Sequence, residues 1–387
     1  MAGLHETQAL LRQLISFPTV SSDSNRDLAA LLADRLDDAG ARVEVQESPD
    51  GRKANLFATL GPDAPGGIVL SGHTDVVPAD DQVWTSDPFE MVERDGRLFG
   101  RGACDMKGFV AAAVAKAPDF AGEPLLRPLH FAFTYDEEVG CLGARALAGW
   151  LKDRGISPGI AIIGEPTNMQ IIEGHKGCCE YTTRFRGLSG HGSTPARGVN
   201  AVEFAVRYVA RLMEIGEELK ARAPADSRFD PPWTTINTGL FTGGNARNAI
   251  PETASVEWEF RPVQSSDFEF VRSKIEDYVR ESLLPAMRGI SPDAEIVTDV
   301  IGEVAELEPT ADNEARDILM QLTGSNTTDV VPFGTEAGIF AALGMSTVVC
   351  GPGSIQQAHK PDEFVAVDQL AKCLTMLDRL EERLHGR

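Results

Sequence analysis

Six ionisable side chains of this 387-residue chain stand at the ends of apolar runs or in glycine-rich loops beside them. Such runs are typical of buried strands, and open α/β sheets bind their ligands at the carboxyl ends of these strands. We therefore expect the six side chains to meet at one edge of a sheet. They are His73, Asp105, Glu137, Glu138, Glu165 and His359.

These residue types suit metal-dependent hydrolysis. Two imidazoles and three carboxylates form a mixed N/O ligand set suited to zinc or cobalt. Five ligands exceed the needs of one catalytic metal, but a bridging carboxylate would let them hold two metals with positions open for water. Neighbouring strand residues point in opposite directions, so one of Glu137 and Glu138 can bind metal while the other acts as a general base. Asp75 shares a face with His73, so its carboxylate can accept the second ring N–H of that histidine.

Each of these residues, taken alone, also has an ordinary structural explanation. His73 suits a satisfied strand-end histidine, and Asp105 suits a helix cap. The pair Glu137–Glu138 suits a solvated strand end, and Glu165 could form an ion pair with Lys176. It is the combination of two histidines with three carboxylates that indicates a metal centre.

The elements that must position these residues follow an α/β pattern. Continuous apolar runs alternate with helical stretches in the first half of the chain, and the pattern returns near the C-terminus. This alternation favours a mostly parallel sheet with helices on both faces. The expected strands include residues 55–61, 67–72, 129–135, 160–166 and 346–351.

The middle of the chain has a different pattern. The run from Gly177 alternates like a half-exposed strand, and a long helical stretch, two further strands and a second helix follow. This order is typical of a small ferredoxin-like α+β layer with its helices on one face of an antiparallel sheet. We predict an inserted domain over residues 177–289, which divides the catalytic domain into residues 1–176 and 290–387.

Composition excludes several classes of function. The chain has 36 basic and 58 acidic residues, a formal net charge of −22, so its field repels nucleic acids and anionic membranes. No stretch approaches the roughly 18 apolar residues of a membrane span, and the N-terminus lacks a secretory pattern. The six cysteines include no CxxC pair and are expected to be reduced in a cytoplasmic protein. No G-x-G-x-x-G follows the first strand, which argues against a nucleotide-binding oxidoreductase.

Six motifs carry a family resemblance. In order along the chain they are HTDVVP, GRGACDMKG, DEEVG, IIGEPT, GLSGHGSTPARGVNA and GPGSIQQAHKPDEF. Their order and approximate spacing resemble the di-zinc acetylornithine deacetylase/succinyl-diaminopimelate desuccinylase family, which also includes carboxypeptidases and aminoacylases. The resemblance covers essentially the whole chain, and the six motifs together are highly specific.

The resemblance implies a role for each predicted ligand. His73 and Glu165 would bind one divalent metal ion, and Glu138 and His359 the other, with Asp105 bridging the two. Zn²⁺ is the expected metal, with Co²⁺ as the alternative.

The resemblance also implies roles for residues beside the metals. Glu137 would be the general base, and Asp75 would orient His73. A cis peptide bond is expected between Asp105 and Met106.

For the inserted domain, the resemblance implies a lid that also forms a homodimer. His191 would reach across the dimer to stabilise the oxyanion in the partner's active site. Asn248 and Arg261 match substrate-binding positions, and a guanidinium suits the α-carboxylate of an amino-acid substrate. Outside the family, His191 would be an ordinary loop histidine and Arg261 an ordinary strand-surface arginine.

Finer similarities point towards a substrate. The motifs WTSDPF, FGTEAG and GPGSIQQAHKPDEF are closer to the deacetylases, which implies hydrolysis of N²-acetyl-L-ornithine to L-ornithine and acetate in arginine biosynthesis. Thr335 and Glu336 would lie near the substrate, and Glu336 could meet its δ-ammonium or simply begin a helix. Arg247 adds a positive charge beside Asn248 and keeps acetylcitrulline open as an alternative.

The sequence also allows other substrates and functions. Succinyl-diaminopimelate is a further acyl substrate, and a dipeptidase or carboxypeptidase of the same family would differ only in its pocket. A non-catalytic binding scaffold is a remote alternative, because the ligand set is complete.

Overall fold

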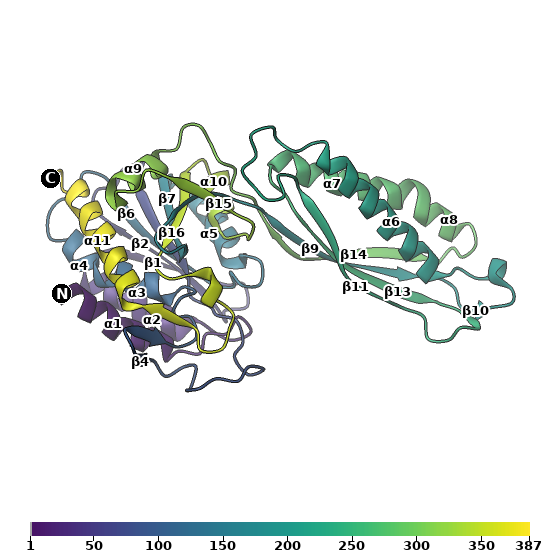
Figure 1. Cartoon of the computed structure of the whole chain (residues 1–387), viewed down its shortest axis with the longest axis horizontal. Helices are drawn as coiled ribbons and strands as arrows, with labels where there is room; N and C mark the ends of the chain where they lie inside the picture. Colours follow the sequence, from purple (N-terminus) through teal and green to yellow (C-terminus); the bar gives the residue numbers. More distant parts are fainter. Residues whose placement is uncertain (1) are drawn as a thin grey trace. The chain divides into compact units, whose positions relative to one another are not determined.

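The computed structural model describes residues 2–387, which divide into two compact units (Figure 1). Unit 1 contains the chain up to Gly174 together with Pro309–Val330 and Thr335–Arg387. Unit 2 contains His175–Glu308 and Val331–Gly334. Each unit has its own hydrophobic core.

Unit 1 is built on an eight-stranded sheet with strand order β1-β2-β6-β3-β7-β16-β8-β15. Strands β6, β3, β7 and β16 are parallel to one another, whereas β1 and β2 are antiparallel. The strands in sheet order are β1 Arg42–Glu47, β2 Ala54–Leu60, β6 Leu129–Thr134, β3 Ile68–His73, β7 Ile160–Pro166, β16 Ser346–Gly351, β8 Ile171–His175 and β15 Thr328–Val331.

Helices cover both faces of this sheet, which confirms the predicted α/β fold (Figure 1). Helices α2, α3 and α9 pack on one face, where α1 and α11 pack against α3, and helices α5 and α10 pack on the other. Because both faces are covered, every residue of β2, β3, β6 and β7 is buried, and these strands are the continuous apolar runs of the sequence. The helices are α1 Ala2–Ile15, α2 Arg26–Asp38, α3 Lys107–Ala115, α4 Ala117–Phe120, α5 Leu142–Arg154, α9 Glu314–Thr323, α10 Ala337–Ala342 and α11 Val367–Leu384.

A small three-stranded sheet completes the edge of unit 1. It pairs β4 Val92–Arg94 and β5 Arg97–Phe99 with β17 Phe364–Ala366. Strand β5 leads into the loop that carries Asp105, and β17 follows the turn that carries His359. The pairing of β5 with β17 therefore joins two chain segments that are more than 250 residues apart.

Unit 2 is a four-stranded antiparallel sheet of order β11-β13-β9-β14, with helices on one face (Figure 1). Side chains of β9 and β13 mostly alternate between buried and partly or fully exposed, as expected for a sheet covered on one side. The buried side includes Phe185, Trp258 and Phe260, which lie in one cluster with Tyr208 of the long helix. The main elements are β9 Cys178–Arg186, α6 Ala201–Lys220, β11 Thr235–Gly243, β13 Thr253–Arg261, α7 Ser265–Tyr278, a π-helical turn Val279–Leu283, α8 Leu284–Arg288 and β14 Glu295–Val304.

Strand β14 makes unit 2 longer than the predicted insert of residues 177–289. It pairs with β9 along nine register positions, so the chain leaves unit 2 only after this fourth strand. As an edge strand, β14 has mostly exposed or half-exposed side chains and lacks a continuous apolar pattern. A two-residue ladder of β10 Gly190–His191 with β12 Ala249–Ile250 belongs to the same unit.

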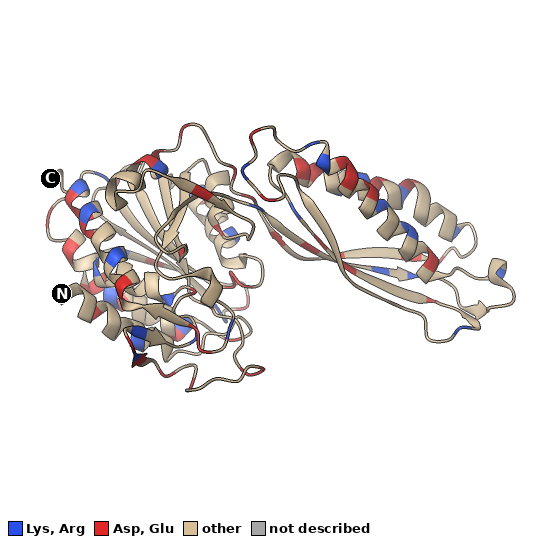
Figure 2. Cartoon of the chain, viewed as in Figure 1, with Lys and Arg blue, Asp and Glu red and all other residues tan. Residues whose placement is uncertain are grey.

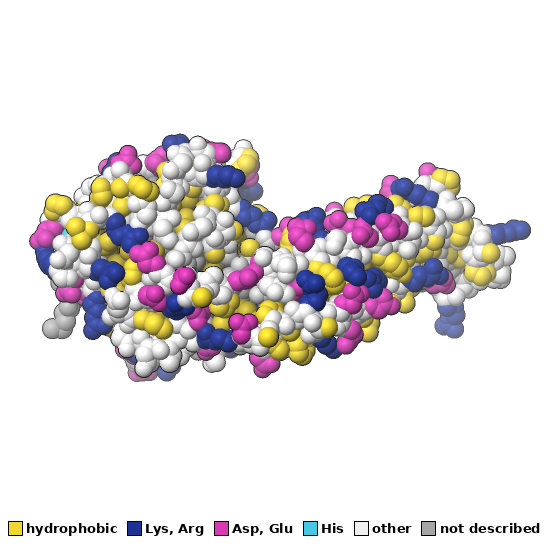
Figure 3. Space-filling model, turned by 90° about the horizontal axis from the view of Figure 1, so that it is seen from above, with side chains coloured by type: hydrophobic (Ala, Val, Ile, Leu, Met, Phe, Trp, Pro, Cys, Tyr) yellow, Lys and Arg dark blue, Asp and Glu magenta, His cyan; other side chains and the backbone are white. Residues whose placement is uncertain are grey.

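Charged side chains lie mainly on helices and loops, and along the strands of unit 2 (Figure 2). On the face drawn in Figure 3, acidic and basic side chains are interspersed rather than gathered by sign. Among residues 2–387, no helix combines the length and the apolar character that a bilayer crossing requires.

Candidate metal centre

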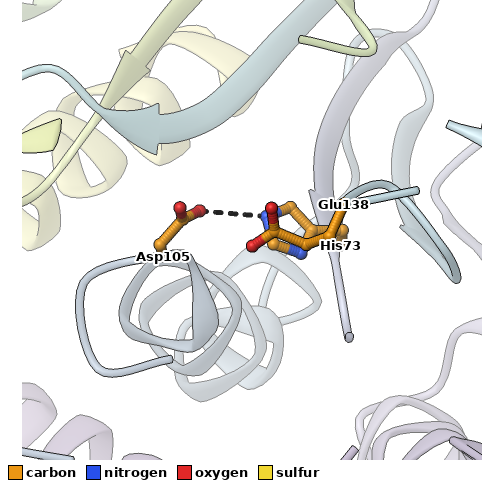
Figure 4. A group of neighbouring side chains, drawn as sticks. All are labelled: His73, Asp105 and Glu138. Carbon is orange, nitrogen blue, oxygen red and sulfur yellow. Dashed lines mark hydrogen bonds and ion pairs between the residues drawn. The ribbon is translucent and has the colours of Figure 1, made fainter. Parts of the chain in front are cut away.

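The first half of the candidate centre is formed by His73, Asp105 and Glu165, three buried side chains of unit 1. His73 ends β3, and its Nε2 lies 3.0 Å from Asp105 Oδ1 and 3.7 Å from Glu165 Oε1. Glu165 comes from the carboxyl end of the neighbouring parallel strand β7. Asp105 approaches from the loop before α3, as Figure 4 shows. Two adjacent strand ends and one loop thus bring an imidazole and two carboxylates together.

The second half shares Asp105. Its other oxygen, Oδ2, lies 3.3 Å from His359 Nε2, and the same nitrogen lies 3.0 Å from Glu138 Oε2. Glu138 Oε1 is 3.2 Å from that nitrogen. Since each oxygen of Asp105 faces a different histidine, its carboxylate has the placement that a ligand bridging two metals requires.

Charge and burial determine what this arrangement can hold. Burial raises the pKa of Glu165, and the Asp105 carboxylate adds to the increase. Burial also raises the pKa of Asp105, but hydrogen bonds from His359 and His73 outweigh it and hold the pKa well below its usual range. Burial lowers the pKa of His73, yet Glu165 and Asp105 outweigh it and leave the pKa well above its ordinary value.

Glu137 lies beside this cluster, and its carboxylate comes within 4.8 Å of ligand atoms of His73 and Glu165. Burial raises the pKa of Glu137 to about 8, with opposition from His73 and reinforcement from Glu138 and Asp105. The cluster therefore contains more buried carboxylates than imidazoles. Bringing like charges together out of water costs free energy unless cations neutralise them, so the donor set fits divalent metal ions of the zinc type.

Comparison with known proteins agrees with this centre. Residues 69–383 match Peptidase family M20/M25/M40. The chain is 37% identical over 363 residues to an acetylornithine deacetylase of Shigella sonnei (strain Ss046), which covers 92% of each chain.

The chain belongs to peptidase family M20/M25/M40. It is thus a metal-dependent hydrolase, and the predicted resemblance is confirmed.

Solved structures agree on the M20 fold. A tripeptidase from Staphylococcus aureus superposes with a TM-score of 0.75 at 18% identity, covering 99% of each chain. A dinuclear metal-binding M20 peptidase from Bacillus subtilis superposes with a TM-score of 0.64 at 16% identity, covering 100% of this chain and 99% of that one. At these identities the likeness shows the fold alone.

Asp75 contacts His73 through its main chain, whereas the sequence analysis expected a contact through its carboxylate. His73 Nδ1 lies 2.9 Å from the backbone carbonyl oxygen of Asp75, whereas the nearest Asp75 carboxylate oxygen is 3.7 Å away. The carboxylate instead accepts hydrogen bonds from the backbone N–H groups of Glu137 at 3.0 Å and Glu138 at 3.3 Å, and from Ser21 Oγ at 2.7 Å. Asp75 thus fixes the His73 ring through its main chain and the glutamate turn through its side chain.

Thr335 and Glu336 lie inside unit 1 rather than on a surface that a substrate could reach. Thr335 Oγ1 accepts the backbone N–H of Ala337, and Glu336 accepts hydrogen bonds from Ser71 Oγ at 2.6 Å and Thr134 Oγ1 at 2.7 Å. Glu336 is fully buried, so its predicted contact with a substrate ammonium is not supported. Its carboxylate ties the start of α10 to β3 and β6 beneath the metal centre.

The remaining predicted site residues belong to unit 2, and their roles stay predictions. His191 is exposed on β10, and its Nδ1 lies 2.7 Å from Ser193 Oγ. Asn248 is also exposed and directly precedes β12. The guanidinium of Arg261 donates to both oxygens of Glu259, at 2.9 and 3.3 Å, on the face of the sheet away from the helices.

One residue of the centre carries almost no signal in the sequence. Glu363 is buried, and its carboxylate accepts backbone N–H groups of the loop that carries Asp105. The peptide bond that follows Asp105 in this loop is cis, as the family resemblance implies. The place of Glu363 in the motif GPGSIQQAHKPDEF, four residues after His359, is the signal that could have drawn attention to it.

Proposed function

We propose that this hydrolase removes the acetyl group from N²-acetyl-L-ornithine, giving L-ornithine and acetate. The observation that supports this substrate most directly is the 37% identity, over 92% of the chain, to an enzyme named acetylornithine deacetylase. The complete cluster of two histidines and four carboxylates, including Glu137, supports the hydrolytic chemistry. In this proposal the enzyme works in the cytoplasm, in arginine biosynthesis.

Two Zn²⁺ ions, or two Co²⁺ ions, are the proposed cofactors. His73 and Glu165 would hold one ion, Glu138 and His359 the other, and Asp105 both. When bound, the metals would polarise the amide carbonyl and make a water molecule more acidic.

Glu137 is the proposed general acid–base group, because its carboxylate lies within 4.8 Å of ligand atoms of His73 and Glu165. It is proposed to take a proton from the attacking water and to return it to the departing amine. Burial raises the pKa of Glu137 to about 8. Cations bound beside it would lower this pKa towards neutral pH, where one carboxyl group can both take and return a proton. The hydrogen bonds from the Glu137 and Glu138 backbone to Asp75 keep the turn, and hence Glu137, in place.

Unit 2 is proposed to be the dimerisation and lid domain. The side chain of His191 is exposed, as its proposed role in a partner subunit requires, and would donate a hydrogen bond to the carbonyl oxygen as negative charge develops there. Arg261 and Asn248 are proposed to bind the substrate, with the guanidinium on the α-carboxylate.

A substrate panel tests the proposed activity. Enzyme loaded with Zn²⁺ or Co²⁺ would be offered acetylornithine, acetylcitrulline, succinyl-diaminopimelate and simple dipeptides, and kcat/KM compared. We expect acetylornithine to be the best substrate. A higher kcat/KM for acetylcitrulline or for a dipeptide would overturn the substrate assignment while leaving the hydrolase intact.

Mixing two inactive variants tests the role of His191. Glu137→Gln lacks the base, and His191→Ala lacks the oxyanion donor, so each homodimer is impaired at both sites. A mixed dimer has one complete site if His191 acts in the partner, so random exchange should restore roughly a quarter of wild-type turnover. No gain on mixing, under conditions where exchange is verified, would mean that His191 does not act across a dimer.

A further inference from the structure

Glu363 is a buried acid that touches the metal centre without belonging to its ligand set. Its side chain is 1% exposed, and it lies between His359 and strand β17. A buried carboxylate requires several hydrogen bonds or an ion pair to compensate for its lost hydration. The partners of its hydrogen bonds therefore show which part of the structure Glu363 stabilises.

Within residues 2–387, the side-chain hydrogen bonds of Glu363 go to one loop. Oε1 accepts the backbone N–H groups of Cys104 at 2.8 Å and Asp105 at 3.0 Å. Oε2 accepts the backbone N–H of Gly102 at 3.0 Å and a hydrogen bond from Arg101 Nη1 at 2.9 Å. Bonds to an ionised acceptor are shorter and stronger than neutral ones, so Glu363 fixes the main chain on which the Asp105 side chain is mounted.

Arg101 connects this network to His359, another of the predicted metal ligands. Its side chain is also 1% exposed, and Nη2 donates to Gln82 Oε1 at 2.6 Å and to the Pro78 carbonyl at 3.1 Å. Gln82 Nε2 in turn donates to the backbone carbonyl of His359 at 2.7 Å. The His359 backbone has φ +60°, a left-handed conformation that a β-substituted residue keeps only when its surroundings hold it there.

We propose that Glu363 is a positioning residue for the metal pair, which sets the distance between Asp105 and His359 through the Asp105 loop and the Arg101–Gln82 arm. This inference rests on the proposed use of Asp105 and His359 as ligands. A loop that moved by a fraction of an ångström would no longer place the two Asp105 oxygens against both histidines. A role in folding alone would not require every contact of Glu363 to converge on the ligand-bearing loop.

Glu363→Gln is the test. An amide nitrogen in place of Oε2 cannot accept the hydrogen bonds from the Gly102 N–H and from Arg101 Nη1. Metal-free protein would be titrated with Co²⁺, with the heat of binding and the visible absorption of the bound ions recorded. We expect at least one of the two binding steps to weaken by about 10- to 100-fold, as is typical when a partner of a metal ligand is changed. The visible spectrum of the Co²⁺ pair should change as well.

Glu173→Gln is the matched control. Glu173 is also buried in unit 1 and also contacts an arginine, with Arg316 Nη1 at 3.2 Å. It also accepts a hydrogen bond from Thr328 Oγ1, so these contacts join β8 to α9 and β15 and not to the loop that carries Asp105. This variant should bind Co²⁺ as the wild type does. A Glu363→Gln protein with wild-type affinity for both ions and a wild-type spectrum would overturn the proposal.

Gln82→Ala provides an independent variant in case Glu363→Gln does not fold. Gln82 is half-buried on a loop, and its loss breaks only the arm to His359. A weakening of one Co²⁺ step, smaller than that expected for Glu363→Gln, would support the proposal, and unchanged binding would overturn it. The wild-type titration separates the positioning role of Glu363 from the proposed function. Fewer than two Co²⁺ ions bound to the wild type would refute the metal pair itself.

Discussion

The sheets of the two units differ in how many of their faces are covered. In unit 1 both faces carry helices, and the residues of β2, β3, β6 and β7 are all buried. In unit 2 the helices lie on one face, so β9 and β13 alternate between buried and partly or fully exposed side chains. The same kind of charged residue therefore has a different meaning in each sheet.

A charged side chain at the end of a doubly covered strand must have a buried partner, because its desolvation is otherwise too costly. His73 and Glu165 are in this situation, and each has its partners within the cluster. A charged side chain on the open face of unit 2, such as Glu257, faces solvent and needs no functional reason to be there. Charge at a buried strand end is therefore the stronger indication of chemistry.

The largest expected effect of this difference is on turnover. Glu137→Gln should leave the metal content unchanged and lower kcat by about 10²- to 10⁴-fold, since general base catalysis typically contributes that much. The same substitution at Glu257 on the open face should leave kcat within about twofold of the wild type, the scale of a neutral surface change. Steady-state kinetics with metal analysis of both variants check this. Wild-type rates from Glu137→Gln would refute its role as the base.

The second effect is on stability. Phe131 on β6 is fully buried between the helical layers, and Phe131→Ala should lower the free energy of unfolding by about 3–5 kcal/mol. Val297 on β14 is 49% exposed, and Val297→Ala should cost less than about 0.5 kcal/mol. Urea unfolding followed by circular dichroism measures both. Similar losses in the two variants would contradict the difference in coverage.

The coverage of each sheet also decides how much of the structure the sequence could predict. The strands of unit 1 were predictable because burial on both faces makes them continuous apolar runs, and their ends located His73 and Glu165. Strand β14 was not, because an edge strand in a singly covered sheet has few buried side chains.

Part of the centre depends on contacts that leave no pattern in the sequence. The Asp75 main-chain carbonyl holds the His73 ring, and a backbone acceptor is the same whatever the residue type. Glu363 binds amides of a loop more than 250 positions away, so its place four residues after His359 does not indicate this contact. Burial of Glu336 at the start of α10 likewise depends on hydrogen bonds from Ser71 on β3 and Thr134 on β6.

The third effect is on the pH dependence of stability. Burial, with a contribution from Arg42, lowers the pKa of His130 in the unit 1 sheet to about 4 from an ordinary value near 6.5. The folded state thus resists protonation, and its stability should fall as the pH drops from about 6.5 to about 4. At about 1.4 kcal/mol per pKa unit, the loss from this residue is roughly 3 kcal/mol.

His130→Asn isolates this contribution. Asparagine removes the titrating ring, so the free-energy difference between wild type and variant should shrink as the pH falls through this range. Both proteins share the titration of the metal ligands, which cancels in the difference. A difference that stays constant between pH 7 and pH 4.5 would show that His130 is not held neutral by burial.

The smallest effect concerns Arg261, where the open face makes the sequence prediction weakest. Arg261 donates to both oxygens of Glu259, which by itself accounts for a surface arginine. If it also binds the substrate α-carboxylate, Arg261→Lys should raise KM by about tenfold with little change in kcat, because lysine cannot make the two parallel bonds of a guanidinium. Arg184→Lys on the same face of neighbouring strand β9 is the control and should leave KM unchanged. An unchanged KM in both variants would mean that Arg261 only pairs with Glu259. The open face of this sheet would then not be a substrate-binding surface.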